Sequence, residues 1–198
     1  MNEDQNTVQP EAVIADTQRW LERAVIGLNL CPFAKSVHVK GQVHYVVSPA
    51  TTAQDLRGDL RRELAALHAT DPELRDTTLL IAPYCLRDFL DFNDFLDEAD
   101  TVLAELGLEG ELQIASFHPQ FQFAGTDAED ITNYTNRAPY PILHLLREAS
   151  IDRAVEAFPE AETIYEKNMQ TMRQLGHAGW SALALNARGS SKKGGESS

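Results

Sequence analysis

The sequence predicts a single mixed α/β domain, and three observations support this. Of the 198 residues, 43% are hydrophobic and 24% are charged, a composition typical of a folded chain. Short apolar runs alternate with amphipathic helical patterns, giving a β-α-β-α-β order in the middle of the chain. A chain of this length builds one hydrophobic core and leaves little room for a second. We therefore expect an α/β (or α+β) fold with a sheet of three strands or slightly more, an N-terminal helix and two C-terminal helices.

The first quarter of the chain predicts a helix, a strand and a second helix. Apolar residues recur at helical spacing over residues 11–28, and Pro32 prevents this helix from continuing. Residues 42–47 are rich in β-branched and aromatic side chains, which favours a strand. The pattern over residues 51–68 indicates the next helix.

The middle of the chain predicts two further strands on either side of a helix. The apolar run at residues 77–82 ends at Pro83 and indicates a buried strand. Asp88 is suited to cap the following helix, and Gly107 is suited to end it. Residues 111–117 then predict the third strand of the β-α-β-α-β core.

The last third begins with an irregular stretch and is then expected to be helical. The roughly twenty residues after the third strand show no periodicity, and loops of that length in compact domains are often functional. Pro139 and Pro141 suit the first turn of a helix, so we expect one over residues 142–157. A final helix is predicted over residues 160–175, ending at Gly176.

The chain termini are expected to be disordered, which leaves residues 11–186 as the single domain. Residues 1–10 are polar and acidic, and residues 187–198 are mostly Gly, Ser and Lys. No signal peptide is apparent, and no apolar run approaches the length of a membrane span. The two cysteines, Cys31 and Cys85, follow no disulfide or metal-binding spacing. These features predict a cytoplasmic protein.

Charge is distributed unevenly along the chain. With 30 acidic and 17 basic residues the formal net charge is −13, which argues against nucleic acid or an anionic membrane as partner. Residues 23–54, 112–126 and 131–147 nevertheless contain no Asp or Glu. We expect these segments to form an acid-free, Arg/His-lined pocket for a small anionic molecule. The alternative is that strands and Pro-rich loops are poor in acids for structural reasons.

The carboxyl ends of the predicted strands carry polar side chains. Residues 48–49, 83–85 and 118–121 follow the three strands. Ligands of open α/β sheets usually bind beyond these ends, so we expect the site there.

Cys31 and His118 are the candidate catalytic residues. Lys35 adds positive charge near Cys31, which favours a nucleophilic or redox-active thiolate. Alternatively, Cys31 is a small buried apolar residue, or part of a haem-responsive Cys-Pro contact. His118 follows a strand and is well placed to act as a general base or metal ligand. The alternative is an imidazole satisfied by a backbone carbonyl.

A polar stretch in the last third supplies the candidate substrate-binding residues, which are Asn133, Asn136, Arg137, His144 and Arg147. His144 and Arg147 are three positions apart and would share one face of the predicted helix. Arg137 and Arg147 suit a carboxylate or phosphate group, while the other side chains would orient the substrate. Alternatively, the two arginines pair with structural acids nearby.

Three classes of function remain open at this level. The first is an enzyme that acts on a small anionic metabolite through Cys31. The second is a metal- or haem-binding protein that uses Cys31, His118 and His144, because a thiolate and two imidazoles suit zinc or iron. The third is a non-catalytic interaction module. The sequence specifies no cofactor and no oligomeric state.

Four motifs together resemble the bacterial family called domain of unknown function 1415. They are GLNLCPFA at residues 27–34, ASFHP at 115–119, NYTNR at 133–137 and PYPILHLLRE at 139–148. The similarity covers roughly residues 17–176 and implies a single-domain bacterial protein, but it supplies no substrate. It also implies that the motif positions Cys31, His118, Asn133, Arg137, His144 and Arg147 belong to the family pattern.

Overall fold

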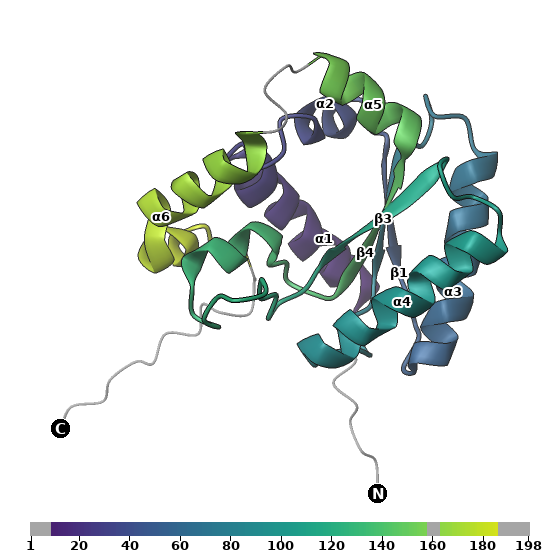
Figure 1. Cartoon of the computed structure of the whole chain (residues 1–198), viewed down its shortest axis with the longest axis horizontal. Helices are drawn as coiled ribbons and strands as arrows, with labels where there is room; N and C mark the ends of the chain where they lie inside the picture. The colour runs from purple at the N-terminus through teal and green to yellow at the C-terminus, as the bar shows by residue number, and fades with distance from the viewer. Residues whose placement is uncertain (1–8, 158–162, 186–198) are drawn as a thin grey trace, which may run out of the picture.

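A four-stranded mixed sheet with the strand order β1-β2-β4-β3 organises the molecule (Figure 1). In this computed structural model, which describes residues 9–157 and 163–185, the strands are β1 Val43–Val47, β2 Thr77–Ile81, β3 Leu112–Phe117 and β4 Ile142–Arg147. β1 is parallel to β2, and β4 is antiparallel to both β2 and β3. The three predicted strands are confirmed, and β4 is inserted between the second and the third.

Helices account for most of the rest of the described chain. They are α1 Pro10–Trp20, the π-helical η1 Leu21–Ile26, α2 Ala34–Val39, α3 Ala53–Ala69, α4 Phe89–Glu105, the 3-10 helix η2 Ile131–Asn136, α5 Glu148–Ala157 and α6 Ile164–Ala182. The predicted N-terminal helix and two C-terminal helices are confirmed, whereas α2 was not predicted. The terminal segments predicted to be disordered lie outside the described residues, except for Gln9 and Pro10, which form the N-cap and the first residue of α1.

Side-chain caps begin the two long helices between the strands. The Thr52 hydroxyl accepts a hydrogen bond from the Asp55 amide, 3.2 Å away, at the start of α3. The Asp88 carboxylate accepts one from the Leu90 amide at 2.8 Å, which confirms the predicted cap of α4. Gly107 follows α4 with a φ of 67°, a conformation that favours glycine and ends the helix as predicted.

The helix predicted over residues 142–157 is wrong in its first part, which is β4, and correct in its second, which is α5. The apolar run in β4 fits either structure, because a strand buried on both faces and a buried helix look alike over a few residues. Here both strand edges are paired, with β2 on one side and β3 on the other. His144 and Arg147 therefore point to opposite faces of the sheet and do not share a helix face.

The final helix continues past its predicted end. Gly176 interrupts α6 with φ 61° and ψ 175°, and the helix then resumes as far as Ala182. The start predicted at residue 160 lies outside the described residues.

Each face of the sheet has its own core. Leu80, Leu143 and Leu145 pack against α3 and α4 on one face. Leu79 and Ile142 pack against α1 and η1 on the other face. Figure 1 shows α3 and α4 on one side of the sheet, with α1, α2 and α6 on the opposite side. This second, less evenly covered face carries the site described below.

Candidate functional site

A cavity of about 810 Å³ lies on the face of the sheet opposite α3 and α4. Its floor is formed by inward-facing strand residues, which are Val43, Thr77, Leu79, Gln113, Phe117, His144 and Leu146. Side chains of α1, η1, α2 and α5, together with the loop before β2, form the walls. A cavity of this size accommodates a small organic molecule.

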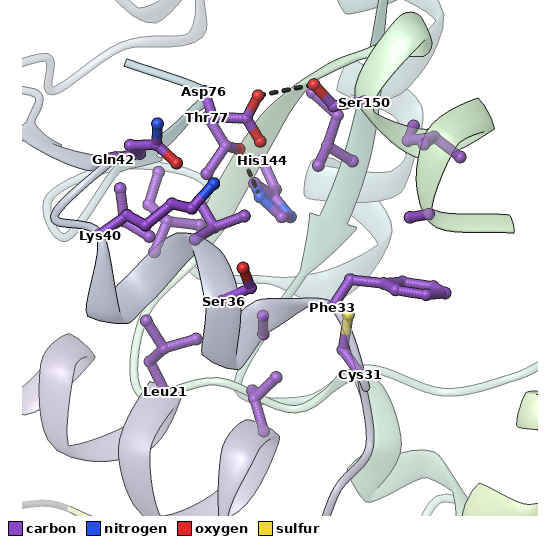
Figure 2. A pocket seen from close by; sticks show the side chains of 18 of the residues that line it. Leu21, Cys31, Phe33, Ser36, Lys40, Gln42, Asp76, Thr77, His144 and Ser150 are labelled. Carbon is purple, nitrogen blue, oxygen red and sulfur yellow. Dashed lines mark hydrogen bonds between the residues drawn. The ribbon is translucent and has the colours of Figure 1, made fainter. Parts of the chain in front are cut away.

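The cavity has a polar end and an apolar end (Figure 2). The polar end gathers Lys40, Gln42, Asp76, Thr77, His144 and Ser150, and the apolar end is formed by residues including Leu21, Cys31 and Phe33. The polar end adjoins the amino ends of β1 and β2, because Gln42 and Asp76 immediately precede these strands. The cavity therefore does not lie beyond the carboxyl ends, where the sequence places the site.

The imidazole of His144 is held in one orientation by Thr77. Thr77 Oγ1 lies 2.7 Å from His144 Nε2 and 2.6 Å from the carbonyl oxygen of Leu145. The hydroxyl has one proton, which it donates to the carbonyl, so it accepts a hydrogen bond from Nε2–H. Nδ1 of His144 then carries the lone pair. Burial lowers the pKa of His144 to about 4, so the ring is neutral at physiological pH.

Two hydrogen-bonded groups flank His144 at the polar end. Ser150 of α5 donates a hydrogen bond to Asp76 Oδ1 at 2.6 Å, which ties the helix to the start of β2 (Figure 2). Gln42 donates its amide hydrogen to the carbonyl oxygen of Glu73 at 3.0 Å, which leaves Oε1 of Gln42 as an acceptor. The polar end thus combines a neutral imidazole, a carboxylate and an amide oxygen with the exposed ammonium group of Lys40.

Cys31 lines the apolar end of the same cavity, in the loop that leads into α2. Burial raises the pKa of its thiol, an effect that hydrogen bonds from the backbone of Phe33 and Ala34 oppose only in part. The surroundings therefore favour the neutral thiol.

Alkylation of Cys31 is expected to require a higher pH than alkylation of an unperturbed thiol. In a Cys85→Ala variant, Cys31 is the only thiol, and its rate of reaction with iodoacetamide should reach half its maximum above pH about 8.5. The same variant unfolded in urea is the control and should titrate near about 8.5. A folded-state midpoint below that of the control would show that Cys31 is an activated thiolate.

His118 is buried on the opposite face of the sheet, away from Cys31 and His144. Its ring packs against the rings of Phe89 and Phe92 of α4, with centroid distances of 5.4 and 5.1 Å. Nδ1 accepts a hydrogen bond from the Gln120 amide at 3.0 Å, and Nε2 lies 3.1 Å from the Leu86 carbonyl oxygen. Burial lowers its pKa. Both ring nitrogens are thus satisfied by the backbone, as in the structural alternative considered for this residue.

Asn133 and Asn136 hold the long irregular stretch after β3 together. Asn133 is fully buried, and its side-chain amide makes four hydrogen bonds within residues 123–128. The carbonyl oxygen of Asn136 accepts a hydrogen bond from the His118 amide at 3.2 Å. Neither asparagine lines the cavity.

Arg137 and Arg147 lie apart and bond to backbone carbonyls. Arg137 donates to the carbonyl oxygens of Phe121 and Ala128 at 3.2 and 2.6 Å. Its guanidinium also lies over the ring of Tyr134. Arg147 projects to the α3 face and bonds to carbonyls at the end of that helix. The two guanidinium groups therefore do not form a common anion clamp.

All three acid-free segments contribute to the cavity, but its lining is not acid-free. Each segment supplies at least one lining residue, for example Cys31, Phe117 and His144. The loop before β2 adds three carboxylates, from Asp71, Glu73 and Asp76, and the cations at the cavity are Lys40 and Arg153 rather than the predicted arginines. Sequence reasoning missed Asp76, Thr77 and Ser150, because nothing in their local pattern separates them from ordinary strand and helix ends.

The described residues offer no metal-binding cluster. Across residues 9–157 and 163–185, no three His, Cys, Asp or Glu side chains are placed to hold a metal ion. Cys31, His118 and His144 do not form a ligand set, because His118 lies across the sheet from the other two. Among the described helices, none combines the length and the hydrophobicity that a membrane-spanning segment requires.

The fold and the site define a mixed α/β protein with a cavity of small-molecule size on one face of its sheet. The chain belongs to the family described as protein of unknown function (DUF1415), whose model matches residues 12–182. Neither a curated protein nor a solved structure matches the chain.

Proposed function

We propose that this chain binds a small molecule in the cavity, with an apolar body and a polar head group. The segregation of the lining supports the proposal: polar groups gather at the end nearest His144, and most of the remaining lining is apolar. Small-molecule sites typically combine an apolar lining with a few polar groups that orient the ligand. The apolar body would lie against Leu21, Val25 and Leu79, and the head group would face Gln42 and His144.

Chemistry at Cys31 is a second candidate function, in which the bound molecule is an anionic metabolite attacked by the thiolate. The position of Cys31 at the same cavity as His144 favours it. The raised pKa of the thiol counts against a resident nucleophile, and the alkylation profile described above tests this candidate.

A variant that fills the cavity tests the binding proposal. Ser36 of α2 is exposed, and its hydroxyl points into the cavity, so the helix tolerates a larger side chain there (Figure 2). We expect the neutral dye Nile red to bind the unmodified chain saturably in a fluorescence titration. Ser36→Trp should weaken this binding at least about tenfold, because the indole occupies the ligand's space.

Val39→Trp provides the matched control. Val39 lies on the same helix, is 76% exposed and does not line the cavity, so this variant should keep its affinity within about twofold. Equal affinities for the unmodified chain and Ser36→Trp would place the dye elsewhere and contradict the proposal.

A further inference from the structure

The polar end of the cavity is richer in fixed hydrogen-bond acceptors than in fixed donors. Gln42 is only 6% exposed, and its Oε1 accepts no hydrogen bond from any described residue. Nδ1 of His144 likewise accepts no hydrogen bond from any described residue, and the ring is fixed by the contact of Nε2 with Thr77. Within the described chain, Tyr45 Oη is the one occluded side-chain nitrogen or oxygen without a partner. Oε1 of Gln42 and Nδ1 of His144 are not occluded in this way, although they also lack a described partner. These two acceptor atoms are therefore accessible, and both residues line the cavity.

Asp76 adds a negatively charged acceptor at the same end. Ser150 occupies Oδ1 of this carboxylate, and no described residue donates a hydrogen bond to Oδ2. Gln42, Asp76 and His144 come from three adjacent parts of the sheet, just before β1, just before β2 and within β4. Figure 2 shows all three around one end of the cavity.

The balance of charge at the cavity also favours a cation. Asp71, Glu73 and Asp76 contribute three carboxylates to its lining, against the cations of Lys40 and Arg153. Both cations are exposed, as are Asp71 and Glu73, so Asp76 is the least exposed of these five charged groups. Arg153 donates a hydrogen bond to Ser150. The chain as a whole carries a formal net charge of −13, so the surrounding field attracts positive ligands.

We infer that the head group of the ligand is a protonated amine, held by Asp76 together with the free acceptor atoms of Gln42 and His144. This inference rests on the proposed function of the cavity. An alkylammonium group has three N–H donors, which matches the three acceptors, and its bond to the carboxylate is charge-assisted. A carboxylate head group would instead leave these acceptors unpaired and face Asp76 with like charge. The neutral state of His144 is compatible with a cationic ligand, since no proton needs to be taken up.

The preferred head group can be tested with three compounds that share one apolar body: 4-phenylbutylamine, 4-phenylbutan-1-ol and 4-phenylbutanoate. In calorimetric titrations at pH 7 in physiological salt, we expect the amine to bind about tenfold more tightly than the alcohol, and the carboxylate to bind most weakly. Asp76→Asn should remove most of the amine's advantage and leave the alcohol within about twofold. Its amide oxygen still accepts the hydrogen bond from Ser150, so the fold is retained.

Asp152→Asn is the control for net charge, because Asp152 is exposed on α5 and does not line the cavity. It should keep the preference for the amine. Equal binding of the three compounds, tighter binding of the carboxylate, or an amine preference that survives Asp76→Asn would each overturn the amine inference while the cavity remains the site. Absence of binding by all three compounds, or equal binding to Ser36→Trp, would overturn the proposed function itself.

Discussion

Replacing Asn133 with alanine is expected to lower the free energy of unfolding by about 3 kcal/mol. The side-chain oxygen of Asn133 accepts hydrogen bonds from the Phe123 amide at 3.0 Å and the Thr126 hydroxyl at 2.8 Å. Its amide nitrogen donates to the carbonyl oxygens of Asp127 and Ala128 at 2.8 and 3.4 Å. Asn133 is fully buried, so alanine leaves the Phe123 amide without a partner and removes one hydrogen bond each from the Thr126 hydroxyl and the two carbonyls. Urea unfolding at pH 7 measures the change.

Asn93→Ala is the control for this substitution. Asn93 is exposed on α4, where alanine is a better helix former, so its stability should change by less than about 0.5 kcal/mol. If Asn133→Ala were as stable as this control, Asn133 would not be a structural residue of the loop.

Replacing Arg147 with alanine is expected to cost about 2 kcal/mol of stability. Its Nη2 donates to the carbonyl oxygens of Leu67 and Thr70, both at 2.6 Å, and to that of Arg75 at 3.2 Å. These carbonyls end α3 and begin the approach to β2, and a cation at a helix C-terminus is favoured by the helix dipole. Thermal or urea unfolding measures the loss, and binding of Nile red by the folded protein should be unchanged.

Arg62→Ala is the matched control for Arg147. Arg62 lies on α3, and its side chain is 59% exposed. Its partner Asp59 is only 13% exposed, but that carboxylate keeps the hydrogen bond from Ser48 when Arg62 is removed. Its removal should cost less than about 1 kcal/mol. If folded Arg147→Ala lost dye binding without losing stability, Arg147 would be a ligand-binding residue and not a structural one.

The fold was largely predictable because its elements follow local rules. Helical periodicity, the cap at Asp88 and the glycine at position 107 specify α4 from sequence alone. A run of β-branched and aromatic residues specifies β1, and an apolar run ended by Pro83 specifies β2. The strand β4 was not predictable, because its apolar run becomes a strand only through pairing with β2 and β3. Tertiary contacts of this kind override local periodicity.

The candidate site was predictable only in part. Cys31 and His144 do line one cavity, and their acid-free segments lead to it. Arg137 looked like a ligand residue because its side chain is polar and lies in an irregular stretch, yet it bonds to carbonyls of that stretch. The sequence does not distinguish a polar side chain that hydrogen-bonds to nearby backbone groups from one that binds a ligand. The importance of Asp76 depends on where β4 and α5 fold, which no local pattern encodes.

Adjacent leucines in the strands provide the most direct test of the cavity as the binding site. Leu79 and Leu146 line the cavity, whereas their neighbours Leu80 and Leu145 belong to the core against α3 and α4. Titration of 4-phenylbutan-1-ol into protein with ¹³C-labelled leucine methyl groups should shift the NMR signals of Leu79 and Leu146. The signals of Leu80 and Leu145 should change little. Shifts confined to Leu80 and Leu145, or no shift at Leu79 and Leu146 at saturation, would contradict a ligand site on this face of the sheet.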